Sequence, residues 1–145
     1  TRLDLNNNLI ISDISPLENL TSLTNLYLAN NSISGILPLE NLTSLTDLFL
    51  GSNSISDISP LKNLTSLATL YLGSNNISDI SPLENLTSLA TLYLVTNRIS
   101  DLSPLVSNMG LSSGDRISIT RNPLSAVSIN THIPALQARG VSVNF

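Results

Sequence analysis

The sequence repeats itself every 22 residues through most of its length. The same phrase begins at four leucines that are spaced 22 positions apart: Leu23, Leu45, Leu67 and Leu89. Residues 45–66 read LTDLFLGSNSISDISPLKNLTS, and residues 67–88 read LATLYLGSNNISDISPLENLTS. Residues 23–44 follow the same phrase, with Gly35 and Leu37 in place of the usual aspartate and serine. Units of this size bury their apolar side only against their neighbours, so the period predicts a solenoid of stacked coils.

Each repeat has the pattern of a short strand, a bend and a helical turn. Alternation places Leu48 and Leu50 on one side of a strand and Phe49 on the other. Asn53 follows at a bend, where its amide both donates and accepts hydrogen bonds to backbone groups. The Ser-Pro pair at 59–60 fits a helix cap followed by proline in the first turn. Seven aliphatic side chains of this repeat are expected to face inward: Leu45, Leu48, Leu50, Ile55, Ile58, Leu61 and Leu64.

The bend asparagine recurs at the same place in successive repeats. When the coils stack, these side chains are expected to form a structural asparagine ladder made of Asn8, Asn31, Asn53, Asn75, Asn97 and Asn122. The Ser-Pro pair recurs as well, at 15–16, 81–82 and 103–104. We therefore expect a short helical or 3₁₀ turn on the return side of most coils.

Written out, the repeat is L-x-x-L-x-L-x-x-N-x-I-x-D-I-x-P-L-x-x-L-x-x, and it covers nearly the whole chain. This pattern resembles the leucine-rich-repeat family, in the 22-residue bacterial form seen in internalins. The resemblance implies an α/β solenoid, a curved horseshoe with a parallel β-sheet on its concave face and short 3₁₀ or helical turns on its convex side. It also implies a binding module, because members of this group use such solenoids to bind host surface proteins.

The repeats divide the chain as one leucine-rich-repeat domain over residues 1–145. The expected repeats are about 1–22, 23–44, 45–66, 67–88 and 89–113, followed by a C-terminal repeat and cap at 114–145. The first strand begins at once, with no N-terminal cap before it. We therefore expect the chain to be a fragment of a longer protein.

The C-terminal segment predicts a helix followed by a strand. Three apolar residues fall at helical spacing: Ile129, Ile133 and Leu136. Ser128 is expected to cap this helix, Gly140 to end it, and Pro134 to kink it or mark its start. Residues 141–143 are expected to form the last strand. Together they would cover the final apolar layer of the solenoid.

Most of the aromatic residues share one outward position of the expected strands. The column at this position reads Asp4, Tyr27, Phe49, Tyr71, Tyr93, Ser118 and Ser142, and it holds four of the chain's five aromatic side chains. Aromatic residues are enriched among binding hot spots. We therefore expect ligand binding on the concave face, at Tyr27, Asp47, Phe49, Tyr71, Tyr93, Arg116 and Arg121.

The same aromatic column has a second interpretation. Rings on neighbouring strands stack on one another and shield the sheet, as cross-strand pairs do. A repeat copied by recombination would also copy its tyrosine without any selection for binding. Solvated surface positions are the common alternative for Arg116 and Arg121.

Composition and charge argue against most other functions. The chain has no cysteine and a formal net charge of −4, and no apolar run is long enough to cross a membrane. Residues 1–95 have two basic and eight acidic residues, and residues 96–145 have four basic and two acidic ones. An acidic body gives no electrostatic reason to bind nucleic acid or an anionic membrane.

No catalytic or metal site is expected. His132 is the lone histidine, and no acid stands at a convincing spacing from it in the sequence. The aspartate column, Asp13, Asp57, Asp79 and Asp101, offers one acid per repeat, which is too few for calcium and fits local capping. The N-L-T triplets at 19, 41, 63 and 85 match the glycosylation pattern, but they recur with the repeat and are interpreted as structural.

We therefore expect a non-enzymatic module without cofactors that binds a protein partner, with a glycan as a further candidate ligand. We expect a monomer, although the uncapped N-terminal edge offers a surface for self-association. The expected location is extracellular or on a bacterial cell surface. Two alternatives remain open at this stage: an intracellular scaffold or regulatory subunit, and a purely structural spacer.

Overall fold

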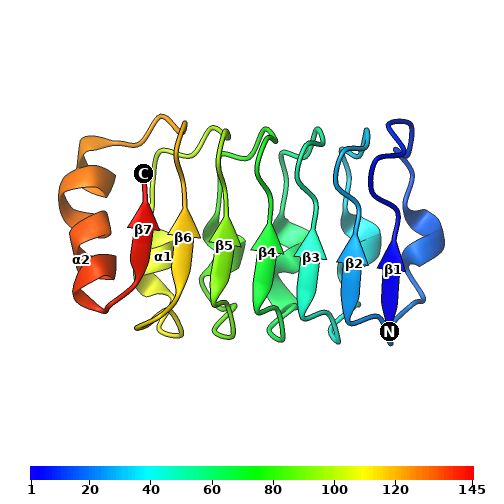
Figure 1. Ribbon diagram of the computed structural model, residues 1–145, viewed down its shortest axis with the longest axis horizontal. Coiled ribbons are helices and arrows are strands. Elements are labelled where there is room, and N and C mark those ends of the chain that lie inside the picture. The colour runs from blue at the N-terminus through cyan, green and yellow to red at the C-terminus, as the bar shows by residue number, and fades with distance from the viewer.

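Seven short strands form one parallel sheet, and their order in the sheet follows the chain. In the computed structural model, which describes residues 1–145, the coils stand side by side in a row (Figure 1). The strands are β1 (Arg2–Asp4), β2 (Asn25–Tyr27), β3 (Asp47–Phe49), β4 (Thr69–Tyr71), β5 (Thr91–Tyr93), β6 (Arg116–Ser118) and β7 (Ser142–Asn144). The predicted parallel-sheet solenoid is confirmed.

The strands β1 to β6 each begin one residue earlier than the alternation of apolar residues suggests, whereas β7 begins one residue later than predicted. In the third coil the strand is Asp47–Phe49, although the sequence predicts residues 48–50. The ladder nevertheless continues, because the Leu50 amide donates to the Tyr71 carbonyl at 2.8 Å. Both Leu48 and Leu50 are completely buried, as their alternation with Phe49 predicts.

The return side of the coils consists of short helical turns. They are η1 (Ser15–Leu17), η2 (Leu37–Leu39), η3 (Ser59–Asn63), η4 (Ser81–Leu83) and the short helix α1 (Ser103–Ser107). The predicted 3₁₀ or helical turns are confirmed, and a proline stands in the first turn of each.

The predicted role of serine as the cap of these turns is wrong. Ser59 is the first residue of η3, and the residue before it, Ile58, makes no side-chain cap bond. The cap bond comes from Asp57, whose Oδ1 accepts from the Ser59 amide at 2.8 Å. An aspartate reaches the amide two residues ahead, so the aspartate column has the local hydrogen-bonding role expected for it. Asp13, Asp79 and Asp101 make the same bond.

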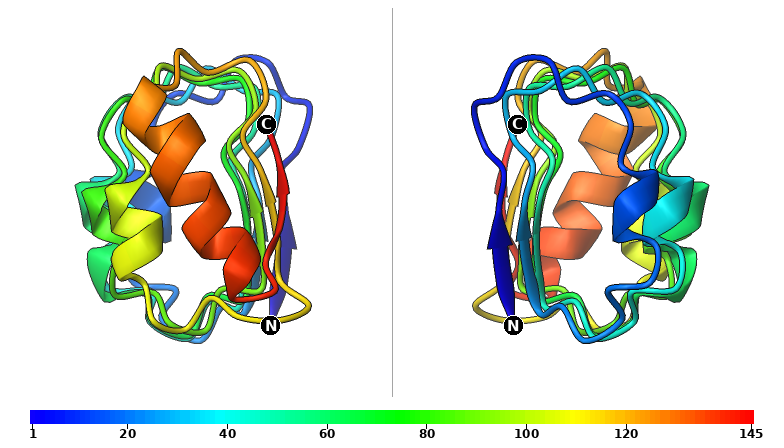
Figure 2. Two further views of the ribbon diagram at one scale, coloured as in Figure 1. Left: turned by 90° about the vertical axis from the view of Figure 1, so that its left-hand side faces the viewer. Right: turned by 90° about the vertical axis from the view of Figure 1, so that its right-hand side faces the viewer.

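One apolar core runs through all the coils. It contains 35 buried aliphatic residues in one continuous cluster, and the seven predicted for the third repeat are all among them. Viewed along the solenoid, the sheet forms one wall, the helical turns form the opposite wall, and α2 (Ile133–Ala138) lies across the C-terminal end (Figure 2). Because each layer is thin, a single coil leaves its apolar side open, and stacking provides the burial.

The C-terminal helix forms, with two differences from the prediction. Its cap is Ser125, whose Oγ accepts from the Ser128 amide at 3.1 Å, whereas Ser128 itself is buried inside the helix. Ile129 is 41% exposed, and only Ile133 and Leu136 pack into the core. Both differences follow from a wide π turn at residues 128–132, which shifts the faces of the helix relative to regular α-helical spacing.

Pro134 and Gly140 mark the two ends of α2. Pro134 has no amide hydrogen, and the wide turn gives way to regular helix at this proline. At the other end Gly140 has a φ of +85°, and the Val141 amide donates back to the Leu136 carbonyl. This left-handed glycine ends the helix and leads the chain into β7.

Candidate functional site

Four aromatic rings stack along the outward face of the sheet. The register pairs Tyr27 with Phe49, Phe49 with Tyr71, and Tyr71 with Tyr93. The ring centroids are 4.6, 4.5 and 4.3 Å apart in the same order, and the planes deviate from parallel by 15–17°. Parallel strands lie about 4.8 Å apart, so the backbone itself sets the stacking distance. We call these four residues the ring stack.

The ring stack exposes edges more than faces. Each of its members is half-buried, and the two inner rings, Phe49 and Tyr71, have a neighbour on both faces. Burial raises the pKa of the Tyr71 hydroxyl, and the adjacent Tyr93 adds to the rise. A ligand on the concave face would therefore meet the rims of the inner rings.

Arg2 covers the N-terminal end of the ring stack. Its guanidinium carbon lies 4.4 Å from the centroid of Tyr27, and its Nη2 lies 3.0 Å from the Asp4 carboxylate. The repeat pattern does not single out Arg2, which was not predicted as part of the site. The available signal was its position two residues before Asp4, which places both side chains on the same face of one strand.

The C-terminal end of the ring stack lies beside small polar residues. Tyr93 pairs with Ser118 in the register, and Ser118 pairs with Asn144. The predicted place of Ser142 in this column is therefore wrong, because Ser142 pairs with Arg116. The error came from aligning residues 141–143 with the leucines of earlier strands, whereas Val143 occupies the first of those positions, opposite Ile117.

The charged candidates differ in how they are held. The Asp47 carboxylate accepts hydrogen bonds from Asn25 Nδ2 and from Thr46 Oγ1, at 2.8 Å for the latter. Arg116 lies on β6 beside Thr91, and Arg121 lies in the turn that follows β6, with a φ of +59°. Neither arginine takes part in an ion pair. Asp47 is thus fixed within the sheet face, while the two arginines are exposed to solvent.

The bend asparagines connect successive coils. Asn53 Nδ2 donates to the Leu28 and Leu50 carbonyls, both at 3.0 Å, and its Oδ1 accepts from the Ile33 amide at 3.0 Å. The Nδ2 groups of Asn31, Asn75, Asn97 and Asn122 likewise donate to carbonyls of their own coil and of the preceding one. Each amide therefore bonds groups from two coils.

The first two members of the asparagine row differ from the others. Asn8 is exposed and donates only within its own turn, to the Leu5 and Asn6 carbonyls. Asn31 donates normally, but its buried Oδ1 has no partner. The first coil explains both, because it has an extra residue in this turn and a left-handed Leu9, so no amide of that coil reaches Asn31.

His132 does have an acidic neighbour, Asp101, although no acid was expected beside it from the sequence. Its Nδ1 lies 3.5 Å from Asp101 Oδ1 and 3.4 Å from Ser128 Oγ. The fold brings Asp101 from the preceding coil, so spacing in the sequence gave no signal. A hydrolytic triad uses both ring nitrogens, one for the acid and one for the serine. Here both contacts are to Nδ1, and the buried Ser128 hydroxyl donates to the Ser100 carbonyl, so the arrangement secures the C-terminal helix.

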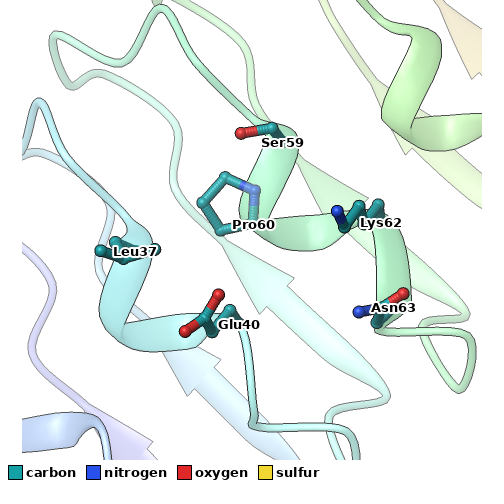
Figure 3. Close-up of a pocket in the computed structure, with 6 residues that line it drawn as sticks. All are labelled: Leu37, Glu40, Ser59, Pro60, Lys62 and Asn63. Atoms are coloured by element: carbon teal, nitrogen blue, oxygen red, sulfur yellow. The ribbon is translucent and has the colours of Figure 1, made fainter.

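The convex side has two shallow hollows around η2. One, of about 90 Å³, lies between Leu37 of η2, the adjacent Glu40, and four residues of η3, which are Ser59, Pro60, Lys62 and Asn63 (Figure 3). The other, of about 290 Å³, lies on the η1 side of the same turn. Leu37 lines both and is 63% exposed, because it replaces the serine of the repeat phrase.

No group of three or more histidine, cysteine, aspartate or glutamate side chains is placed to hold a metal ion. None of the helices has the length and apolar character needed to span a bilayer.

The comparisons with known proteins agree with the geometry. The sequence profile described as Leucine Rich repeats (2 copies) matches residues 21–63, 43–85 and 65–107, which together make up more than half of the chain. The chain belongs to the leucine-rich-repeat family. No curated protein matches it in sequence.

Solved structures place the chain near the internalins. An internalin (inlF) from Listeria monocytogenes is 36% identical, with a TM-score of 0.81, over 94% of this chain and 38% of that one. An internalin C2 (inlC2) from the same species is 32% identical, with a TM-score of 0.71, over 99% of this chain and 70% of that one. The ectodomain of the receptor kinase SOBIR1 from Arabidopsis thaliana, at 23% identity and a TM-score of 0.69, shares the fold.

These findings confirm the predicted internalin-like leucine-rich-repeat class. Proteins of this class are typically non-enzymatic protein-binding modules, and the fold and its relatives support a protein-interaction module here. The chain spans only 38% of the inlF structure, so that protein's whole activity is not transferred to it.

Proposed function

We propose that this chain binds a protein partner on the concave face of its sheet, along the ring stack. The observation that supports this most is the row of four half-buried rings, Tyr27 to Tyr93, at outward positions of adjacent strands. Large aromatic side chains dominate the binding energy of many interfaces, especially where a partner desolvates them. An aromatic row that stays exposed to water contributes no such binding energy.

The ring stack is also preorganised for binding. The backbone register and the mutual stacking hold each ring, so a partner does not need to order them on association. Asp47 is likewise fixed by Asn25 and Thr46. The inner ring faces are covered, which leaves little surface for a sugar to stack on. A protein surface that packs against ring edges is the better match.

We further propose that the chain belongs to a bacterial surface or secreted protein. The support is its similarity to two internalins from Listeria monocytogenes, which covers 94% and 99% of this chain. Protease treatment of intact source cells tests this location. Digestion of the protein on intact cells, or its recovery from the culture medium, is expected. Protection until lysis would favour an intracellular scaffold.

Binding is tested by replacing two rings at once. The wild-type chain and the double variant Tyr71→Ser, Tyr93→Ser are screened in parallel against an array of extracellular proteins. Partners of the wild type should lose about 2 kcal/mol or more of binding energy in the variant, as hot-spot residues do. The convex variant Lys62→Ala is the matched control and should bind as the wild type does. Equal binding by the double variant would refute the concave-face proposal.

A purely structural spacer is the second candidate, and one observation favours it. The rings satisfy one another by stacking, so the column has a structural explanation of its own. This function predicts that the screen returns no saturable partner for the wild type. The double variant should lose stability under either function, since each stacked pair contributes about 1 kcal/mol, so the screen with the wild type is the result that separates them.

A further inference from the structure

The outer face of Tyr93 ends the ring stack without a stacked ring or cation. Tyr71 packs on one face of Tyr93 at a centroid distance of 4.3 Å. On the other side the register places Ser118 and then Asn144, whose Nδ2 donates to Ser118 Oγ at 3.3 Å, and no ring or cation stacks on Tyr93 there. Strands β5, β6 and β7 stand next to one another at this end of the sheet (Figure 1). We call Tyr93, Ser118 and Asn144 the open end of the ring stack.

The opposite end shows what a terminal ring of this stack accepts. Tyr27 is covered by the planar guanidinium of Arg2 at 4.4 Å, close to the spacing between the rings themselves. No arginine or lysine of the chain covers Tyr93 in the same way. The two ends of the ring stack therefore differ by one planar group. The corresponding position next to Tyr93 lies above Ser118.

Two exposed arginines without ion-pair partners stand before and after Ser118 in the chain. Arg116 is two residues before Ser118 on the same strand face, about 7 Å along the strand. Arg121 is three residues after Ser118, in the turn that follows β6. Neither forms an ion pair, and the nearby Asp115 carboxylate accepts from the Ser112 amide. A cationic ligand is disfavoured here, whereas one with carboxylates beside its flat group is favoured.

We propose that the open end of the ring stack receives an aromatic side chain of the partner protein, presented between acidic residues. The incoming ring lies above Ser118 as a fifth layer against Tyr93, and Arg116 and Arg121 pair with the flanking carboxylates. This deepens the proposed function and rests on it, since it names where on the concave face the partner anchors and with which chemistry.

The test uses short peptides as probes of the isotope-labelled chain. An acidic pentapeptide with a central tryptophan (Asp-Asp-Trp-Asp-Asp) is titrated while the Tyr93 ring and Ser118 amide signals are followed by NMR. The expected result is a saturable shift at these two residues. The same peptide with a central leucine, and a lysine-flanked tryptophan peptide, should each bind at least about threefold more weakly.

One variant fills the open end with a tyrosine, the residue type that already occurs in the ring stack. Ser118→Tyr places a fifth ring at the position where β2 to β5 have one, so the fold is expected to accept it. This variant should bind the tryptophan peptide about tenfold more weakly, or weaker still. The matched control is Ser81→Tyr on the convex turn η4, where the equivalent position of η2 already accommodates the exposed Leu37. This control should bind as the wild type does.

Three outcomes would overturn the proposal: unchanged peptide binding by Ser118→Tyr, equal binding of the leucine peptide, or shifts confined to other parts of the chain. If cellobiose, but none of the peptides, shifted the NMR signal of the Tyr93 ring, the proposal would also be overturned, in favour of a glycan ligand. Partner proteins found in the array screen distinguish failure of the open-end proposal from failure of the proposed function. A partner lost by the Tyr71, Tyr93 double variant but retained by Ser118→Tyr leaves concave-face binding intact and removes only the open-end proposal.

Discussion

At the scale of single residues, the bend asparagine determines how one coil bonds to the next. Asn75 Nδ2 donates to the Leu50 and Leu72 carbonyls at 3.0 Å, and its Oδ1 accepts from the Ile55 amide at 3.0 Å. These backbone groups are buried and have no water to replace a lost amide. The side chain thus belongs to the backbone hydrogen-bond network of two coils.

We expect Asn75→Ala to lower the free energy of unfolding by about 3 kcal/mol, because it leaves several buried polar groups unpaired. Urea denaturation followed by circular dichroism measures this loss. Asn8→Ala is the informative control, since Asn8 is exposed and bonds only within its own turn. It should cost less than about 1 kcal/mol. Equal losses in the two variants would contradict this explanation.

The asparagine positions were predictable from the sequence, whereas the residue-level partners of Arg2 and His132 were not. The recurrence of asparagine at one place in every repeat reflects a backbone requirement that every coil shares. Arg2 and His132 occur once each in their settings, and their neighbours come from folding. The repeat pattern predicts only features that recur in every coil. It therefore does not predict contacts that occur once, at the two ends of the solenoid.

At the scale of elements, the aspartate that precedes each convex turn makes stability depend on pH. The Ser59 amide and hydroxyl hold the pKa of the Asp57 carboxyl below its usual value of 3.8, and Ser15 does the same for Asp13. For Asp101 the Ser103 hydroxyl and amide lower the pKa, with a smaller effect from His132.

A carboxyl whose pKa falls on folding contributes stability that is present above its unfolded pKa and is lost as the pH falls through the folded one. The urea midpoint should therefore be steady from about pH 7 to pH 5 and decline below about pH 4. Asp57→Asn should make that decline shallower, since one linked proton is removed. A midpoint that rises on acidification would contradict the assignment.

In the second repeat a capping aspartate can be added. Gly35 stands where the other repeats have aspartate, and Leu37 where they have serine. The η2 turn therefore has no side-chain cap bond, and nothing lies within 4 Å of a Cβ built on Gly35. Gly35→Asp with Leu37→Ser should raise the free energy of unfolding by about 1 kcal/mol through a new cap. Thermal unfolding of this variant beside Leu37→Ser alone isolates the cap. Equal stability of the two would show that the added aspartate makes no bond.

At the scale of the whole molecule, the repeat predicted the architecture because one set of contacts is reused in every layer. The coil, the inward leucines and the outward ring column followed from the repeated phrase. The sequence failed where repetition stops, at the wide turn of residues 128–132, the register of β7 and the cap serine. There the last layer is covered by a helix whose placement depends on packing and not on a repeated pattern.

A linear stack of coils also predicts that damage at one end stays local. Arg139 joins the C-terminal helix to α1, since its Nη1 donates to the Val106 carbonyl and its Nη2 to the Leu105 and Asn108 carbonyls. Arg139→Met keeps the packing of the stem but removes these bonds, and it should cost about 2 kcal/mol. Because each layer contacts only its neighbours, the loss should concentrate in the terminal units.

Hydrogen exchange distinguishes this local loss from a global one. In Arg139→Met the amides of α2 and β7 should exchange about tenfold faster or more, while those of β3 keep their wild-type protection. Arg98→Met is the matched control, because Arg98 takes part in no ion pair and makes no side-chain hydrogen bond. It should leave both regions unchanged. Uniformly faster exchange across all seven strands would mean that the solenoid unfolds as one unit, and that the C-terminal helix stabilises every coil and not only the last.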